Sequence, residues 1–306
     1  MRPEAALVLE FEFKKGMGMQ GTVAQVVSLV TYGNQYLSNG GDSLVSDFYP
    51  SNSTFKFCKM VSFIDLVQDK KKCVPIPYSN DPITWFSHLA KEKYKTLRIS
   101  YFKSGRTDVP DRMLAGFVGG GGKWLIEAIG PQGSDFWEAN WIVGNKDDPD
   151  KKVWLVAYRR VAASESTRSF SALDPAALKA TLKRNLGAIL GFCRKNKIEA
   201  FPKFFETALL SLDSDSPLDG VGYPGIVPKH ALSLDARQLL GAAQAAWVFG
   251  GMGSWNDLGF TGEEKTIYDG LSEELYLLII NAILYATNTS NNRAPQSAVK
   301  SPWKFW

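Results

Sequence analysis

The stretch from Met113 to Val161 constrains the fold most, because strand-like segments alternate there with short turn sequences. Connections rich in glycine, proline, asparagine and aspartate are typical of antiparallel hairpins. The pattern predicts a β-meander whose strands read RMLAGFV, KWLIEAI, DFWEANWIV and KKVWLVAYRRV. The connections read GGGG, GPQGS and GNKDDPD. Four of the nine tryptophans fall inside the meander, so an antiparallel sheet with an unusual aromatic load is expected.

The strands can be aligned if each connection is treated as a tight turn. Val143 then pairs with Lys152, and Ile129 pairs with Asp135. Glu127 falls beside an aromatic face that consists of Trp137, Trp141, Trp154 and Tyr158. The opposite face is also largely apolar, so the sheet is either covered on both sides or exposes an aromatic platform. These four residues are therefore either core or a stacking surface for a flat ligand such as a sugar or a base.

Composition indicates a globular protein that can bury a core, since 45% of the 306 residues are hydrophobic and 22% are charged. The three cysteines lack C-x-x-C spacing, which indicates a reducing compartment and predicts no metal site. The first residues carry glutamates where a signal peptide needs an apolar run, and no apolar run has the length of a membrane span. We expect a cytoplasmic location and no membrane.

Charge is nearly balanced, with 35 lysines and arginines against 31 aspartates and glutamates. Basic residues gather at 70–72, 91–98 and 183–197, on separate elements and without a nucleic-acid-binding motif. Runs of charge are usually solvated faces. The sequence therefore predicts no nucleic-acid partner.

The chain divides by pattern into an α+β region with an antiparallel sheet, residues 1–163, and a helical region, residues 170–289. The first region starts with a half-exposed strand, Ala6 to Phe13. The polar sequence AASESTRS lies at the expected boundary, although the two regions could be fused into one domain. A mobile tail, 290–306, is expected at the end.

Capping signals place several helices. Asp81-Pro82 and Asp174-Pro175 each combine an N-cap with proline at the first helical position. Thr261 and Glu264 are spaced as a capping box before a long amphipathic helix. The preceding helix, 234–249, is rich in small residues, so these two helices are expected to pack as antiparallel neighbours.

Gly16, Gly18 and Gly21 form G-x-G-x-x-G between an expected strand and an expected helix, as in a dinucleotide-binding turn. The strand carries Glu10 and Glu12, whereas a first Rossmann strand is apolar throughout. The following strands also fail to alternate with helices. We therefore expect a flexible connection and no cofactor, with nucleotide binding as an alternative.

A second glycine-rich loop, GGMGSWND at 250–257, lies between two expected helices. Its glycines would let a ligand approach the backbone, and Ser254, Asn256 and Asp257 would offer polar groups to it. The other interpretation is a tight interhelical turn with Trp255 as its anchor. The chain has only two histidines, His88 and His230, and neither is near this loop in sequence, so no Ser-His-Asp triad is evident.

The sequence thus favours a non-catalytic module that binds a protein partner or a small molecule. In this hypothesis the strands present the surface and the helices support it. The alternative is an enzyme with a carboxylate-based or nucleotide-dependent site between the sheet and the 250–257 loop. The scarcity of histidine and the lack of a nucleophile or metal motif favour the module.

Overall fold

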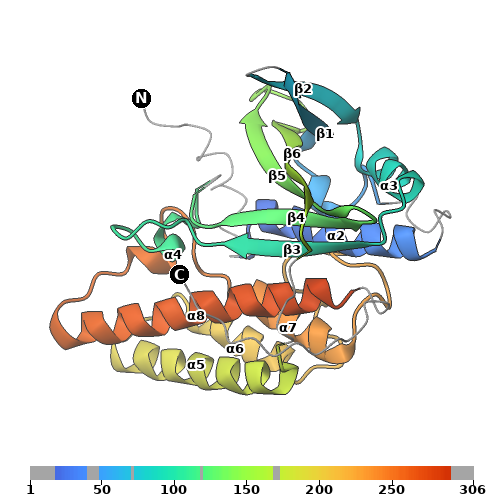
Figure 1. Ribbon diagram of the computed structural model, residues 1–306. Helices are drawn as coiled ribbons and strands as arrows, with labels where there is room; N and C mark the ends of the chain where they lie inside the picture. The colour runs from blue at the N-terminus through green and yellow to red at the C-terminus, as the bar shows by residue number, and fades with distance from the viewer. Residues whose placement is uncertain (1–17, 40–47, 70–71, 118–119, 168–172, 291–306) are drawn as a thin grey trace.

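The protein is α+β, with a six-stranded sheet and a layer of helices beneath it in the computed structural model (Figure 1). The structure describes residues 18–39, 48–69, 72–117, 120–167 and 173–290. The expected strand at 6–13, Gly16 and most of the expected tail lie outside these residues.

The strands are β1 (Cys58–Asp69), β2 (Lys72–Ser79), β3 (Thr96–Phe102), β4 (Lys123–Gly130), β5 (Gly133–Val143) and β6 (Trp154–Glu165). Their order in the sheet is β2-β1-β6-β5-β4-β3. Every neighbouring pair is antiparallel except β1 and β6, which run parallel. The prediction of a purely antiparallel sheet is therefore wrong for the pair β1 and β6. Hairpin signals do not show how a hairpin formed earlier in the chain joins the later strands.

The helices are α2 (Gly21–Ser38), α3 (Pro82–Lys91), α4 (Asp111–Leu114), α5 (Pro175–Lys195), α6 (Pro202–Ser211), α7 (Leu234–Ala245) and α8 (Gly262–Asn288). Two short 3-10 turns are η1 (Ser53–Phe55) and η2 (Trp255–Asp257). Asp81 and Asp174 cap α3 and α5 as expected, each accepting a backbone N–H in the first turn. These caps supply acceptors to N–H groups that lack an intrahelical partner.

Three local expectations are wrong. The segment RMLAGFV is not the first strand of the meander, because Asp111–Leu114 forms α4. Thr261 makes no side-chain cap, and the Glu264 carboxylate binds Lys195 and Asn196. Helix α7 ends at Ala245, four residues earlier than expected, and the buried segment that follows has no regular secondary structure.

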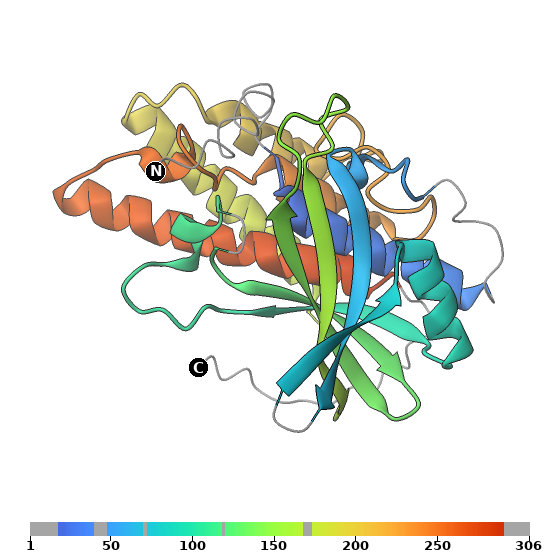
Figure 2. The same ribbon diagram turned by 90° about the horizontal axis from the view of Figure 1, so that it is seen from above.

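The sheet has two contrasting faces, which we call inner and outer. The inner face carries Ile126, Trp137 and Tyr158, and helices α2 and α3 pack on it. The outer face carries Leu125, Phe136 and Arg159 on the same three strands. Figure 2 shows the strands bending around α2 and α3 so that these helices lie within the curve. The principal core therefore forms on the inner face.

Two asparagines join the helices to the exposed edge of the sheet at β3. The Asn34 side chain of α2 donates to the carbonyl of Leu97 at 2.9 Å and accepts from its N–H at 2.7 Å. Asn288, at the end of α8, makes the same pair of bonds to Ile99, at 3.0 and 2.7 Å. These amides occupy the backbone groups that an additional strand would use, which protects the edge.

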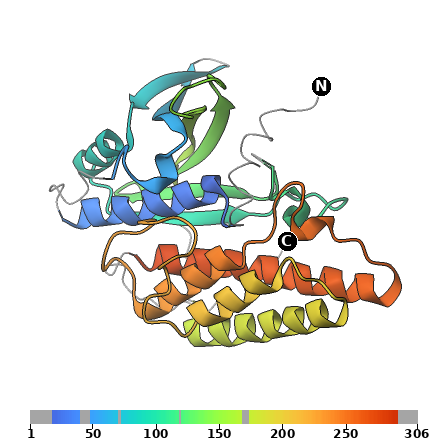
Figure 3. The same cartoon turned by 180° about the vertical axis from the view of Figure 1, so that it is seen from behind.

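Helices α5 to α8 pack against one another beneath α2, as Figure 3 shows from behind. Helices α7 and α8 are in direct contact, as expected. The loop before α7 also joins the sheet region: Ser28 Oγ donates to the carbonyl of Ile226 at 2.7 Å, and Tyr32 to that of Gly225 at 2.9 Å. The division into two domains remains a prediction.

Candidate functional site

The four aromatic residues predicted as a ligand platform lie on the inner face. Trp137 and Tyr158 are fully buried, Trp154 is 7% exposed and Trp141 is partly buried. Trp137 packs edge-on against Trp85 and Phe63, at centroid distances of 5.6 and 5.9 Å. The geometry favours the core interpretation for this group. Ligand binding by it stays a prediction.

The sequence-based register is correct in which face these residues share, but not in their partners. Val143 pairs with Trp154 rather than Lys152, a shift of two residues that preserves the face. Ile129 pairs with Ser134 rather than Asp135, a shift of one that moves Glu127 to the outer face. A shift of one residue exchanges faces because side chains alternate. The turn between Ile129 and Ser134 is tighter than assumed, because Gly130 pairs with Gly133, whereas the connection between Val143 and Trp154 is longer than assumed.

An ion cluster that the sequence did not reveal adjoins the aromatic core. The Arg160 guanidinium binds Asp65 through two nitrogens and donates to Asp135 Oδ2 at 2.9 Å. Its carbon also lies 5.6 Å from the centre of the Trp137 ring. Tyr94 donates to the same oxygen of Asp135, and burial, followed by this carboxylate, raises the pKa of Tyr94. The cluster is saturated internally, which is typical of a structural network.

The polar residues predicted in the 250–257 loop are also held internally. Ser254 and Asp257 form the capping box of η2, with the Asp257 carboxylate accepting the N–H groups of Gly253 and Ser254. Asn256 Nδ2 donates to the carbonyl of Arg112 at 2.8 Å. Trp255 is fully buried and donates to Ser272. The arrangement matches the turn anchored by Trp255. Ligand binding by Ser254, Asn256 and Asp257 stays a prediction.

Arg112, to which Asn256 binds, links this loop to α8. Its side chain is 5% exposed and pairs with Asp269 at 2.7 Å and with Glu273 at 3.7 Å. Asn256 Oδ1 accepts from it at 3.3 Å. The buried guanidinium thus donates hydrogen bonds to Asp269 and Asn256 and lies beside the Glu273 carboxylate, which offsets part of its desolvation. It joins α4, η2 and α8.

A tyrosine pair lies where β3 approaches α8. Tyr101 donates to Asp111 at 2.9 Å, and its oxygen is 3.5 Å from that of Tyr276. Burial raises the pKa of Tyr276 to about 12 and raises that of Tyr101 further. Both phenols therefore stay protonated at neutral pH, so neither serves as a base there.

Within the described residues, the glycine pattern lacks the context of a dinucleotide site. Gly18 precedes α2 and Gly21 is its first residue, where a Cβ would lie 3.2 Å from the Tyr223 hydroxyl. The strand after α2 is β1, which forms a hairpin with β2 and a parallel pair with β6. A doubly wound sheet would pair parallel strands through successive helical crossovers. Gly16 lies outside the described residues.

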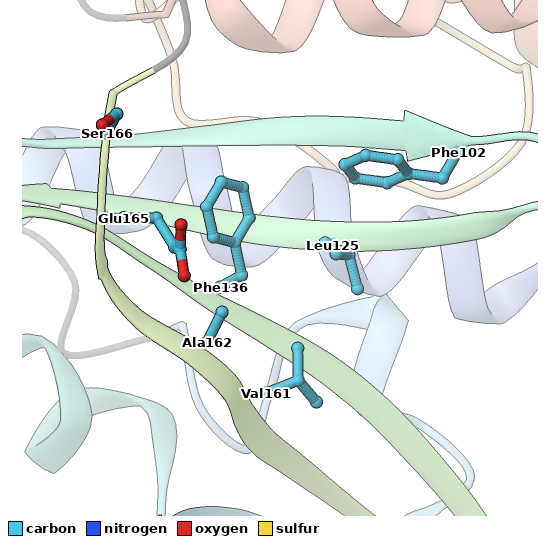
Figure 4. A pocket seen from close by; sticks show the side chains of 7 residues that line it. All are labelled: Phe102, Leu125, Phe136, Val161, Ala162, Glu165 and Ser166. Carbon is cyan, nitrogen blue, oxygen red and sulfur yellow. The ribbon is translucent and has the colours of Figure 1, made fainter. Parts of the chain in front are cut away.

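A hollow with a volume of about 330 Å³ lies on the outer face. Its walls come from β3, β4, β5 and β6 and from the residue after β6. They are Phe102, Leu125, Phe136, Val161, Ala162, Glu165 and Ser166. Figure 4 shows the rings of Phe102 and Phe136 near Leu125, with Val161 and Ala162 on the neighbouring strand. The volume falls at the lower end of the range for small-ligand pockets.

The walls of this hollow are mainly apolar and partly open to solvent. Leu125 and Phe136 are 9% and 5% exposed, whereas Val161 is 43% exposed. Exposed Glu165 supplies a carboxylate near the Phe136 ring (Figure 4). The same face also exposes the apolar side chains of Met60 and Ile142. The Lys123–Glu138 ion pair separates them from the hollow. The sequence predicts a largely apolar face opposite Trp137, but it carries no signal that Val161 and Ile142 of that face are exposed.

Several basic residues of the helical region have acidic partners. Lys179, Lys183 and Lys195 bind Asp235, Asp213 and Glu264 at 3.0, 2.6 and 2.5 Å. Across the described ranges there is no group of three or more histidine, cysteine, aspartate or glutamate residues placed to hold a metal ion. In the same ranges, no helix combines the length and apolar character required to cross a membrane.

Comparison of the whole chain with protein families, with curated proteins and with solved structures finds no match to any of them.

Proposed function

We propose that the protein is a non-catalytic binding module that takes an apolar group of a protein partner or a small molecule into the hollow on the outer face of the sheet. The observation that carries this proposal is the hollow itself, where exposed Val161 adjoins the buried side chains of Leu125 and Phe136. Apolar surface of this kind gains free energy when a ligand removes it from water.

This proposal keeps the surface-presenting role expected of the tryptophan-rich strands but moves it to the opposite face. The tryptophans fill the inner face, where they give the strands a rigid support. A site on rigid strands holds its shape without a ligand, which lowers the entropic cost of binding. The helices contribute indirectly by covering the inner face and the β3 edge.

The enzyme alternative has less geometric support. The polar residues of the 250–257 loop, Ser254, Asn256 and Asp257, hydrogen-bond to the loop backbone and to Arg112. The hollow offers one carboxylate, Glu165, among apolar walls. General acid–base chemistry needs a titratable group within reach of the substrate and usually a partner that orients it. A binding role therefore fits the hollow better.

The test uses the neutral apolar dye Nile red, whose fluorescence rises in apolar surroundings. The dye should bind the full chain, and Val161→Glu should weaken binding at least about tenfold. A loss of roughly 50 Å² of apolar contact already corresponds to that factor, about 1.4 kcal/mol. Binding is measured by fluorescence titration.

Ile142→Glu is the matched control, because Ile142 is 51% exposed on the same face but does not line the hollow. It should leave the dye affinity unchanged. Equal affinities of the parent and the Val161→Glu variant would overturn the proposal, as would an absence of saturable binding in every variant.

A further inference from the structure

The hollow lies within reach of a segment of the same chain that the structure does not describe. Residues 291–306 read NNRAPQSAVKSPWKFW and contain Trp303, Phe305 and Trp306. We infer that this segment binds the hollow through its aromatic side chains and competes there with external ligands. The inference rests on the proposed function, because it names an occupant of the same site.

The first support is where the described chain ends. Ser290 accepts a hydrogen bond from Asn34 Nδ2 at 2.9 Å, and Asn34 is itself bonded to Leu97 of β3. Phe102, a wall of the hollow, is five residues further along the same strand. That separation is about 17 Å at the rise of a β-strand. The thirteen residues from Ser290 to Trp303 span up to roughly 40 Å when extended, so the aromatic residues reach the hollow.

The second support is chemical complementarity. The segment carries Arg293, Lys300 and Lys304 and no acidic residue. The hollow presents the exposed Glu165 carboxylate beside apolar walls. Aromatic side chains flanked by lysines fit a site of that composition, because the rings remove apolar surface from water while an ammonium group lies near the carboxylate.

The third support is the effective concentration. Attachment through about a dozen residues of the same chain gives the aromatic cluster a roughly millimolar effective concentration at the hollow. An intrinsic affinity that would be too weak between separate molecules therefore suffices within one chain. An external ligand must compete with the segment at this local concentration. The segment therefore raises the ligand concentration needed to fill the hollow, which still accepts ligands.

The experiment uses the full chain and a full-length variant with Trp303→Ala, Phe305→Ala and Trp306→Ala. Removing the competing rings should increase the affinity for Nile red at least about tenfold, a difference of about 1.4 kcal/mol. Adding Val161→Glu to that variant should abolish the increase. Gln296→Ala together with Ser297→Ala is the control within the segment, because it leaves the aromatic and basic residues in place, and it should change the dye affinity much less.

A synthetic peptide of residues 291–306 then tests direct occupancy. Added to the triple variant, it should displace Nile red, whereas a peptide with the same three substitutions should not. If the dye binds in a Val161-dependent way but with equal affinity to the parent and the triple variant, the inference fails and the proposed function stands. If binding is independent of Val161 in both proteins, both fail. A change in affinity that appears only as the protein concentration rises, with a doubled mass in light scattering, would assign the hollow to a second copy and overturn the inference.

Discussion

The two faces of one sheet differ sharply although both are rich in apolar residues. On β5, Trp137 of the inner face is completely buried, whereas Ile142 of the outer face is 51% exposed. Helices α2 and α3 pack on the inner face, while the outer face of β5 and β6 keeps exposed apolar side chains. The contrast teaches that coverage, rather than composition, decides which apolar residues form the core. The exposed apolar side chains of the outer face are then available for binding.

The largest expected effect is on the inner face. Trp137→Ala should lower the free energy of unfolding by about 3–5 kcal/mol, because it removes a fully buried ring packed between Phe63, Tyr78 and Trp85. Denaturant unfolding measures the change. Trp141→Ala should cost less, since Trp141 is only partly buried. Near-equal small effects at both positions would contradict the assignment of this face as core.

Two neighbouring arginines of β6, Arg159 and Arg160, lie on opposite faces of the sheet. Arg160 faces inward and binds Asp65 and Asp135, the second of which has a side chain only 4% exposed. Arg160→Met should therefore cost about 2 kcal/mol, a value below that of a completely buried pair because Arg160 and Asp65 are partly exposed. Arg159→Met, on the exposed outer face, should change stability by less than about 0.5 kcal/mol. Equal losses of unfolding free energy for the two variants, measured in denaturant, would contradict the assignment of Arg160 to the buried face and of Arg159 to the exposed one.

The pH dependence of stability tests whether Cys58, at the start of β1, is buried on the inner face. Burial raises the pKa of this thiol from 9.0 to about 12. Above pH 9 the unfolded chain ionises while the folded protein stays protonated, so this contribution to stability falls as pH rises from 9 towards 12. Between pH 8 and 10 the parent should lose about 1 kcal/mol more than Cys58→Ala. Parallel curves of unfolding free energy against pH would show that the thiol is not desolvated.

The smallest expected effect is on the outer face. Val161→Glu and Ile142→Glu should each change the free energy of unfolding by no more than about 0.5 kcal/mol, because both side chains are already largely exposed. A loss of several kcal/mol in thermal or denaturant unfolding would mean that the outer face is core, and the contrast between the faces would disappear.

Much of the fold could be predicted from local signals. The caps at Asp81 and Asp174, the strand TLRISYF and the long final helix all follow from short-range patterns, and the structure has them. The parallel pairing of β1 with β6 could not be predicted, because it joins strands that are far apart in the chain. No turn sequence fixes such a pairing, whereas each hairpin is set by its own connection.

The candidate site was harder to predict for a related reason. The alternation along β5 correctly separates Phe136 from Trp137, but both faces are apolar, and alternation alone does not tell which one the helices cover. The Arg160 cluster was missed because Asp65, Asp135 and Arg160 come from three strands and form no motif in sequence. The loop residues Ser254 and Asp257 looked available because their capping box is a property of the local backbone conformation.

The most direct test of the central claim is a methyl-resolved NMR titration with indole, a soluble mimic of the tryptophan side chain. The protein is the full-length triple variant, Trp303→Ala with Phe305→Ala and Trp306→Ala, so that these rings do not compete. The methyl signals of Val161 and Leu125, on the outer face, should shift in a saturable manner. The signals of Ile126 and Val156, buried on the inner face, should stay in place. Shifts confined to Ile126 and Val156, or no saturable shift at Val161 and Leu125, would contradict it.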